Sequence, residues 1–457
     1  MQSFDLAIIG GGPGGYVAAE RAGAAGLSTV LFEKKSLGGV CLNEGCIPTK
    51  TLLYSAKVYN YAKQADHYGV HNTEGAQLDY AEVMARKDKV VRKLVGGVKA
   101  AMKAGKVTVI SAEAYIEGKE EGLVVISAAG EKYSARNLLI CTGSEAAVPP
   151  FPGLKEAGDV IVTNREILSL KEQPKELVVI GGGVIGMEFA AFYNTIGTKV
   201  TVVEMLPKIL GPLDNEISET LQKIYAKRGI EFCLNCKVTG IEGNKVVYEN
   251  PSGETCRVAG DRILVSVGRR SNVKGIGLEN LGVEVGRGIP ADDRMRTNIP
   301  GVYVAGDAVS GTPMLAHVAS REGEVAVNNI LGKEDHMRYE AVPSVVYTNP
   351  EVAGVGLTEE QAAASGREYA VAKLPMTYAG RYVAENEGSD PSLCKVIYGK
   401  EYHEVLGVHM LGNPSSEMIH SACIAIETEM TIEQLKEIIF PHPTVSEILK
   451  ETAFTVK

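Results

Sequence analysis

The chain has 457 residues, a net charge of −9 and a hydrophobic fraction of 45%, which is enough apolar material for several domain cores. This acidic balance, without any run of Lys or Arg, argues against nucleic acid and anionic membranes as partners. No apolar run approaches the roughly 20 residues that span a bilayer. The first strand pattern begins at Phe4, which leaves no room for a signal peptide, so we expect a soluble, cytoplasmic protein.

An apolar run, a glycine turn and an Ala-rich helical stretch follow one another in FDLAIIGGGPGGYVAAERAGAAGLSTVLFEK. Gly10, Gly12 and Gly15 have the spacing of a dinucleotide fingerprint. The first glycine makes the tight turn, the second lets the backbone approach a pyrophosphate, and the third lets helix pack on strand. Glu33 ends the second strand, where it can accept hydrogen bonds from an adenosine ribose. The pattern predicts a first Rossmann-like domain.

The next motif, GGVCLNEGCIPTK, contains Cys41 and Cys46, which could be a structural staple, a metal site or a redox pair. In a straight helix their Cα atoms would lie about 8.6 Å apart, whereas a disulfide needs about 4.4–6.8 Å. A bond therefore requires a bend between them, which Asn43 and Gly45 permit, and Pro48 suits the start of the next helix. Such a short ring gains little as a staple, and zinc would need a second close pair. The pattern favours a redox pair.

A second glycine cluster, ELVVIGGGVIGMEFAAFYNTIGTKVTVVEM, repeats the first at an offset of 171 residues. Its counterparts of the three glycines and the acid are Gly181, Gly183, Gly186 and Glu204. Two dinucleotide sites in one chain indicate that electrons pass between two dinucleotides, most simply FAD and a nicotinamide. No Arg follows Glu204 to hold a 2′-phosphate, which favours NAD over NADP, although Lys208 argues weakly the other way.

Two shorter features follow. Cys233 and Cys236 form a CxxC in a strand-and-turn pattern, with only Cys256 as a further thiol nearby in sequence. Metal or redox duty is one interpretation, but we expect buried small hydrophobes. Asp307 follows the strand pattern of TNIPGVYVAGDAV, where a carboxylate can bind a ribityl chain at the carboxyl end of a parallel strand. A simple loop cap is the alternative.

Proline-rich and polar segments suggest the domain boundaries. AAVPPFPG (146–153) and GKEDHMRYEAVP (332–343) separate the patterned stretches. The predicted fold class is α/β, with two Rossmann-like dinucleotide-binding domains and an α+β C-terminal interface domain. We predict a discontinuous FAD-binding domain formed by residues 1–147 and 268–337. An NAD-binding domain would span residues 148–267, and an interface domain would span residues 338–457.

Of the eight histidines, His442 is the strongest candidate for a general base. It stands between Pro441 and Pro443, just before an amphipathic terminal helix. Glu447 could orient its imidazole, as in other base-and-carboxylate pairs. Thr444 and Glu447 also match a helix capping box, and the residues alone leave both interpretations open. No histidine spacing suggests a metal site.

Taken together, GGVCLNEGCIPTK, the doubled fingerprint, TNIPGVYVAGDA and the C-terminal HPTVSE resemble the pyridine nucleotide–disulfide oxidoreductases, from Phe4 to the last helix. The cysteine motif is most similar to members that oxidise dihydrolipoamide with NAD⁺. The resemblance implies that Cys41 exchanges with substrate, that Cys46 contacts the flavin, and that His442 and Glu447 serve the disulfide of the partner subunit in a homodimer. Because no lipoyl domain precedes Phe4, we expect the lipoyl group on another protein.

The resemblance also implies further cofactor contacts. Lys50 and Glu188 would pair near the hydride-transfer edge of the flavin, and the helix starting near Ala316 would face its pyrimidine end. Other nucleotide-lining positions carried over by order are Gly39, Ala114, Thr142, Gly143, Val238 and Gly268. Ser271 stands where relatives commonly have proline, which marks this loop as a departure.

Several rival functions differ in readable ways. A glutathione reductase usually uses NADP, against the pattern at Glu204, and a soluble transhydrogenase would not need both Cys41 and Cys46. Relatives with an additional redox pair near the C-terminus differ from this chain, which ends ETAFTVK. A flavoprotein subunit without turnover would not need the set of Cys41, Cys46 and His442.

Overall fold

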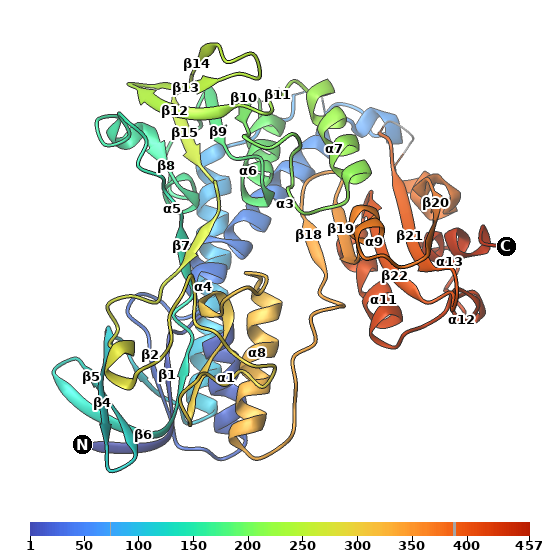
Figure 1. Ribbon diagram of the computed structural model, residues 1–457. Coiled ribbons are helices and arrows are strands. Elements are labelled where there is room, and N and C mark those ends of the chain that lie inside the picture. The colour runs from blue at the N-terminus through green and yellow to red at the C-terminus, as the bar shows by residue number, and fades with distance from the viewer. Residues whose placement is uncertain (74, 387–389) are drawn as a thin grey trace. The chain divides into compact units, whose positions relative to one another are not determined.

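The computed structural model describes residues 1–73, 75–386 and 390–457 and has the predicted mixed α/β class (Figure 1). Its contacts divide the chain into two compact units. Unit 1 combines Met1–Thr51, Ala81–Ala147 and Gly268–Arg338. Unit 2 combines Leu52–Tyr80, Val148–Val267 and Tyr339–Lys457. Each unit is therefore discontinuous in sequence, and the finer division into domains stays a prediction.

Unit 1 is built on a seven-stranded sheet in the order β3-β2-β1-β6-β5-β4, with β17 also paired to β6. The pairs that join β3, β2, β1, β6 and β17 are parallel, and β4, β5 and β6 form an antiparallel meander. The strands are β1 Gln2–Ile9, β2 Thr29–Phe32, β3 Thr108–Ile110, β4 Ala114–Glu120, β5 Leu123–Ala128, β6 Glu131–Ile140 and β17 Val302–Val304. A separate two-stranded antiparallel sheet is formed by β7 Ser144–Ala146 and β16 Arg269–Ser271.

The helices that begin in unit 1 or border it include α1 Pro13–Ala24, α2 Gly39–Glu44, α3 Cys46–Lys63, α4 Tyr80–Ala104 and α8 Ala316–Ile330. Helices α1 and α8 lie side by side (Figure 1). Their backbones meet at Gly14 and Gly323, where a Cβ on Gly323 would lie 2.5 Å from the Gly14 carbonyl oxygen. Two glycines thus permit a helix contact that no larger residue would allow. The short 3₁₀ turns here are η3 Leu278–Leu281 and η4 Gly306–Ala308.

The first part of unit 2 contains an all-parallel sheet in the order β11-β10-β9-β15-β8, with a separate antiparallel sheet of β12, β13 and β14. The strands are β8 Ile161–Val162, β9 Glu176–Ile180, β10 Lys199–Val203, β11 Glu231–Cys233, β12 Lys237–Glu242, β13 Lys245–Glu249, β14 Thr255–Ala259 and β15 Arg262–Val265. Its helical elements are η1 Ala65–Tyr68, η2 Gly158–Val160, α5 Asn164–Ile167, α6 Val184–Thr195 and α7 Asn215–Lys227.

The C-terminal part of unit 2 is a five-stranded antiparallel sheet, β18-β19-β22-β21-β20, which carries helices. Its elements are β18 Ser344–Val346, β19 Val352–Gly356, α9 Glu359–Ala364, β20 Tyr369–Leu374, η5 Met376–Tyr378, α10 Gly380–Glu385, β21 Leu393–Gly399, β22 Val405–Leu411, α11 Ser415–Glu427, α12 Ile432–Glu437 and α13 Glu447–Phe454. Strands and the helices α11 to α13 share one apolar core.

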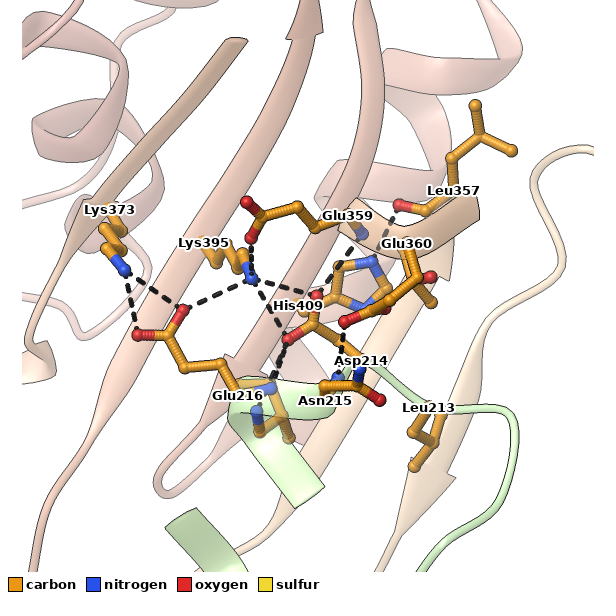
Figure 2. Close-up of polar contacts among 12 residues, drawn as sticks. Leu213, Asp214, Asn215, Glu216, Leu357, Glu359, Glu360, Lys373, Lys395 and His409 are labelled. Atoms are coloured by element: carbon orange, nitrogen blue, oxygen red, sulfur yellow. Dashed lines mark hydrogen bonds and ion pairs between the residues drawn. The ribbon is translucent and has the colours of Figure 1, made fainter. Parts of the chain in front are cut away.

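A buried ion cluster joins these two parts of unit 2 (Figure 2). The ammonium of Lys395, on β21, lies 3.0 Å from Asp214, 3.2 Å from Glu216 and 2.5 Å from Glu359. The Lys395 and Asp214 side chains are 1% and 0% exposed. Asp214 also caps the N-terminus of α7. The cluster therefore fastens the start of α7 to the antiparallel sheet.

Candidate active site

The first glycine turn forms a tight cradle between β1 and α1. Gly10 has a φ of +106°, and a Cβ there would lie 2.1 Å from the Cys141 carbonyl oxygen. A Cβ on Gly15 would lie 1.8 Å from the Gly10 carbonyl oxygen. The Glu33 carboxylate ends β2 and accepts hydrogen bonds from the Gly11 and Lys35 amides at 2.8 and 2.7 Å. The backbone is thus shaped to let a pyrophosphate approach the start of α1.

The second cradle, between β9 and α6, repeats this geometry in unit 2. Gly181 has a φ of +102°, and a Cβ on Gly186 would lie 2.1 Å from the Gly181 carbonyl oxygen. The Glu204 carboxylate accepts hydrogen bonds from the Gly182 and Leu206 amides at 2.6 and 2.7 Å. Both acids therefore tie the end of the second strand to the glycine turn, as the sequence repeat suggests.

Cys41 and Cys46 lie on two different helices, because the chain bends at Gly45 between α2 and α3. A bend between the cysteines is what the sequence analysis required for a bond between them. Both side chains are half-buried, and a side-chain hydrogen bond joins them. The two sulfur atoms are therefore in contact, as thiol–disulfide exchange requires.

The surroundings of the pair hold Cys41 in the thiol form. Its hydrogen bond with Cys46 and its burial raise the pKa of Cys41, and the positive charge of Lys50 opposes this rise. Tyr16, on α1, also has a raised pKa because of burial and the two nearby thiols. The first turn of α1, Lys50 and the dithiol therefore share one neighbourhood in unit 1.

Asp307 lies just after β17, and a polar network fixes it in place. The Ser144 hydroxyl donates to its carboxylate, and the Arg269 guanidinium is 3.8 Å away. Arg269 also donates to the Ser144 hydroxyl at 2.7 Å. The Ser271 hydroxyl donates to the Asp307 carbonyl oxygen at 2.6 Å. The carboxylate is held from several sides, which a simple loop cap does not need.

The unusual Ser271 therefore has a definite contact, which a proline could not make. Arg269 and Ser144 are partners that sequence reasoning missed. The available signal was their position in sequence: Arg269 follows Gly268 and Ser144 follows Gly143, and both glycines were predicted to line a nucleotide. Their pairing across β7 and β16 is long-range and had no local pattern.

A second buried acid, Glu322, was also missed. It lies on α8, is 0% exposed, and accepts a hydrogen bond from the Gly306 amide at 2.6 Å. Helix α8 begins at Ala316, as the sequence suggested. The acid thus anchors this helix to the turn that carries Asp307. In sequence Glu322 stands beside Arg321 and near Glu324, so nothing local marked it as a buried acid.

The buried hydroxyl of Thr142 indicates whether unit 1 has room for a bound cofactor. Its hydroxyl oxygen is buried and has no hydrogen-bond partner within the part of the chain that the structure describes. A buried hydroxyl without a partner is costly unless a ligand or water satisfies it. Thr142 directly follows Cys141, whose carbonyl contacts the Gly10 turn. This position, the cradle and the held Asp307 fit a dinucleotide with a polyol chain.

His442 and Glu447 are in contact at the start of α13. The His442 Nδ1 and a Glu447 oxygen lie 2.9 Å apart, and the other Glu447 oxygen accepts from the Thr444 amide at 2.9 Å. These bonds lower the pKa of Glu447, the Thr444 bond most. The His442 side chain is 77% exposed. The Thr444 amide bond is half of the expected capping box, but α13 begins at Glu447 with Ser446 as its N-cap, and the Thr444 hydroxyl donates to the Pro441 carbonyl instead.

The remaining predicted positions are spread over both units. In unit 2, Glu188 on α6 is 3% exposed and accepts a hydrogen bond from the Tyr347 amide at 3.1 Å. Val238 is a half-buried residue of β12 within an apolar cluster. In unit 1, Ala114 begins β4, and Gly143 and Gly268 have φ values of +67° and +122°. The predicted pairing of Lys50 with Glu188 stays a prediction.

Two dinucleotide cradles and a close dithiol define an oxidoreductase that connects two dinucleotides with thiol–disulfide exchange. The chain belongs to the pyridine nucleotide-disulphide oxidoreductases. The model of that family matches residues 4–323, and the model of its dimerisation domain matches residues 342–453. The family's cofactors, FAD and NAD(H), agree with the prediction, and the dimerisation domain supports the predicted homodimer.

Known proteins resemble the chain over nearly its whole length. Dihydrolipoyl dehydrogenase 3 of Pseudomonas putida is 41% identical over 100% of this chain and 98% of its own. The mitochondrial dihydrolipoyl dehydrogenase of Pisum sativum is 40% identical over 98% of this chain and 90% of its own. The crystal structure of LpdA from Mycobacterium tuberculosis superposes with a TM-score of 0.90, at 25% identity, and covers 100% of both chains.

No helix among residues 1–73, 75–386 and 390–457 has the length and hydropathy that a membrane crossing requires.

Proposed function

We propose that this protein is an NAD-dependent dihydrolipoyl dehydrogenase, which oxidises a protein-bound dihydrolipoamide and reduces NAD⁺. The observation that carries the proposal is the hydrogen-bonded Cys41–Cys46 pair in a chain that aligns almost completely with dihydrolipoyl dehydrogenases. In this proposal FAD, bound to the first cradle, and NAD, bound to the second, supply the carriers for two electrons.

The His442–Glu447 contact supports a role as base and orienter. Because Nδ1 faces the Glu447 carboxylate, Nε2 is left to accept a proton. The lowered pKa of Glu447 keeps that carboxylate ionised near neutral pH, where it stabilises a positive imidazolium. In the dimer, the partner subunit's His442 would take the proton from a substrate thiol.

Thiol–disulfide exchange then moves the electrons. The substrate thiolate attacks the sulfur of Cys41 in the oxidised pair, the Cys41–Cys46 bond breaks, and Cys46 leaves as a thiolate. The second substrate thiol attacks the mixed disulfide and releases Cys41, so that lipoamide leaves and the protein keeps two electrons as a dithiol. The hydrogen bond between the two side chains supports this exchange, because it holds the two sulfur atoms side by side.

The second cradle supports NAD rather than NADP. Glu204 presents a carboxylate where a 2′-phosphate would lie, and like charges repel there. Lys208, the residue that argued for NADP, donates its ammonium to the Leu213 carbonyl oxygen within its own loop. Met205 and Leu206, which follow Glu204, are 64% and 45% exposed and carry no charge. A glutathione reductase-like activity with NADPH is therefore the weaker candidate.

The lipoyl group would arrive on a separate carrier protein, and the cytoplasmic location stays a prediction. The carrier would belong to a 2-oxo acid dehydrogenase complex or to a glycine cleavage complex.

Steady-state turnover of the flavin-loaded dimer tests the proposal. We expect rapid reduction of NAD⁺ by dihydrolipoamide and slow reduction of glutathione disulfide by NADPH. Cys46→Ser should abolish dihydrolipoamide oxidation, because no disulfide can form with Cys41, while the flavin stays bound. Cys423→Ser, a half-buried cysteine on α11, is the matched control and should keep full activity.

Rapid turnover of glutathione disulfide with NADPH would overturn the substrate assignment. Full dihydrolipoamide activity in Cys46→Ser would overturn the exchange mechanism. Direct reduction of a free flavin-like acceptor by NADH should survive in Cys46→Ser, which separates a lost dithiol from a misfolded protein.

A further inference from the structure

A second group of thiols lies in unit 2, away in sequence from Cys41 and Cys46. Cys233 ends β11, Cys236 precedes β12, and Cys256 lies on β14. Tyr248 pairs with Cys256 across β13 and β14, and directly opposed residues of antiparallel strands have adjacent side chains. The Tyr248 hydroxyl is 3.4 Å from the Cys233 sulfur. One phenol therefore contacts Cys233 and neighbours Cys256.

The two cysteines of the CxxC differ in accessibility. Cys233 is half-buried, whereas Cys236 is 4% exposed and its thiol donates to the Leu234 carbonyl oxygen at 3.3 Å. Burial, together with the nearby thiols of Cys233 and Cys256, raises the pKa of Cys236. Our expectation of a buried small hydrophobe thus holds for Cys236 but not fully for Cys233.

Tyr248 supplies a proton donor beside the more accessible thiol. Burial and the hydrogen bond with Cys233 raise the pKa of Tyr248, so its hydroxyl stays protonated at physiological pH. A phenol O–H can donate to a sulfur anion. Tyr248 would therefore stabilise Cys233 when this thiol reacts. No group of three or more His, Cys, Asp or Glu side chains in the described ranges is placed to hold a metal ion, so redox chemistry is the more reasonable use.

The CxxC loop is tied directly to the acid of the second cradle. The Glu204 amide donates to the Cys233 carbonyl at 2.8 Å, and the Cys236 amide donates to the Glu204 carbonyl at 2.9 Å. Asn235, between the cysteines, has a φ of +54° and donates to the Leu206 carbonyl at 3.1 Å. The Glu204 side chain in turn holds the glycine turn. A change in the loop therefore reaches the nucleotide cradle through one residue.

We propose that Cys233 and Cys236 form a second, reversible dithiol whose oxidation weakens dinucleotide binding at the second cradle. This inference rests on one part of the proposed function, the binding of NAD at the second cradle, and does not depend on the substrate. The oxidant is a peroxide. The Cys233 thiolate attacks one peroxide oxygen, the O–O bond breaks, and water leaves after protonation. The Cys236 sulfur then attacks the resulting sulfenic acid, which releases a second water and forms the disulfide.

The step balances, because two thiols and one hydrogen peroxide give one disulfide and two waters. A dithiol reductant reverses it by exchange. An S–S bond of about 2.05 Å requires the Cys236 sulfur to leave the Leu234 carbonyl and the loop to tighten. Tightening acts on the two backbone hydrogen bonds that hold Glu204, and this is the physical link to the nucleotide site.

Peptide mapping tests the bond itself. Trypsin cuts after Arg228 and Lys237, so the peptide GIEFCLNCK, residues 229–237, holds both cysteines and no others. The flavin-loaded dimer, with Cys41 and Cys46 already oxidised, is treated with stoichiometric hydrogen peroxide and alkylated. We expect this peptide to lose two hydrogens and to escape alkylation. A peptide that remains fully alkylated, or a cross-link to the peptide that holds Cys256, would overturn the assigned pair.

Binding of NAD⁺, which cannot reduce the oxidised flavin, tests the consequence by calorimetric titration. Peroxide should raise the dissociation constant about fivefold, as expected for the loss of one backbone hydrogen bond. Cys233→Ser should not respond, whereas Cys256→Ser, the matched control, should respond like the parent protein. A disulfide that leaves NAD⁺ affinity unchanged, or an equal peroxide response in Cys233→Ser, would contradict the proposal.

The outcomes separate this inference from the proposed function. If residues 229–237 form the disulfide and NAD⁺ binding weakens, but dihydrolipoamide is not oxidised, the substrate assignment fails and the dithiol stands. Tyr248→Phe provides a further readout: loss of the hydroxyl should slow disulfide formation about threefold to tenfold without changing NAD⁺ affinity before peroxide is added.

Discussion

The two nucleotide cradles have nearly the same backbone but different surroundings. In both cradles a later segment donates to the glycine turn at 2.8 Å, from the Gly38 amide to the Gly11 carbonyl and from the Leu210 amide to the Gly182 carbonyl. The two differ at the second glycine of the fingerprint. A Cβ on Gly39, the first residue of α2, would lie 2.6 Å from the Gly12 Cα, whereas a Cβ on Gly183 would meet nothing within 4 Å. The first turn is thus more closely approached by its own chain than the second.

This difference suggests how one repeated motif serves two purposes. In the proposed function, the more crowded turn would hold a resident flavin, and the less crowded turn would let a nicotinamide dinucleotide enter and leave. The helices differ in the same way. Gly14 allows α8 to pack on α1, with the Ala319 carbonyl 3.2 Å from a Cβ at that position, while Ile185 is its counterpart in the second repeat. The glycine fingerprint makes the turn in both repeats, and we expect the residues around it to set how fast each dinucleotide exchanges.

Alanine substitutions at the third glycines should have the largest effects and should separate the two cradles. Gly15→Ala puts a methyl group 1.8 Å from a carbonyl oxygen, and Gly186→Ala puts one 2.1 Å from the equivalent oxygen. We expect Gly15→Ala to lose bound flavin. Gly186→Ala should keep it but lose NADH-dependent activity by about 100-fold or more, since a backbone clash costs several kcal/mol. Flavin absorbance per chain and NADH kinetics measure both. Flavin loss in Gly186→Ala alone would reverse the assignment of the cradles.

Removing the buried ammonium of Lys395 should also have a large effect, but on the free energy of unfolding and not on cofactor binding. Lys395→Met leaves Asp214 and two glutamates without their shared ammonium, and an uncompensated buried charge costs about 3–5 kcal/mol. Lys373→Met is the matched control, because Lys373 is 52% exposed and bonds to Glu216. It should change stability by less than about 1 kcal/mol. Urea unfolding measures both; equal losses would show that burial of the cluster contributes nothing.

The same cluster should make unit 2 sensitive to acid. Burial opposes ionisation of Asp214, but the hydrogen bonds and charge of Lys395 outweigh it and lower the pKa of Asp214. A lowered native pKa gives stability that is complete above the unfolded pKa of about 3.9 and is lost as pH falls through the native value. We therefore expect the free energy of unfolding to decline below about pH 4, with a shallower decline in Asp214→Asn. Identical acid profiles would contradict this.

Much of the fold and the cradles could be predicted because their signals are local. Glycines at fixed spacing, the acid at the strand end and the bend between Cys41 and Cys46 each follow from a few adjacent residues. The positions that escaped depend on long-range pairing. Arg269 meets Ser144 across β7 and β16, and Glu322 meets the Gly306 turn from another helix. Nothing near these residues in sequence indicates their partners.

The C-terminal histidine and glutamate show that a local pattern can also be ambiguous. Sequence left Glu447 undecided between orienting His442 and capping a helix, because the spacing satisfies both. In the structure one oxygen contacts His442 and the other accepts the Thr444 amide, while α13 begins at Glu447 with Ser446 as its N-cap. Lys395 had no motif at all, since its three acidic partners come from α7 and α9 and not from its own strand.

Exchanging the two acids for amides should give a smaller, symmetric effect. Glu204→Gln and Glu33→Gln each keep the shape but remove one acceptor from a carboxylate that holds two backbone amides. We expect NAD⁺ affinity to fall about tenfold in the first, and flavin to dissociate about tenfold faster in the second, as for a lost charged hydrogen bond of about 1.4 kcal/mol. Calorimetric titration with NAD⁺ and flavin release measure them. If each amide weakened both dinucleotides equally, the cradles would not be independent.

The smallest expected effect lies at Ser271, in the same unit as the first cradle. Its hydroxyl donates to the Asp307 carbonyl at 2.6 Å, so Ser271→Ala removes one neutral hydrogen bond of about 1 kcal/mol. Flavin should be released about fivefold faster, while NADH affinity stays constant, because the contact belongs to unit 1. Arg270→Ala is the matched control on the same strand, since its ion pair with Glu145 is exposed. Equal flavin release in the two variants would show that strand β16 matters only as a whole, and that the Ser271 contact does not help to retain the flavin.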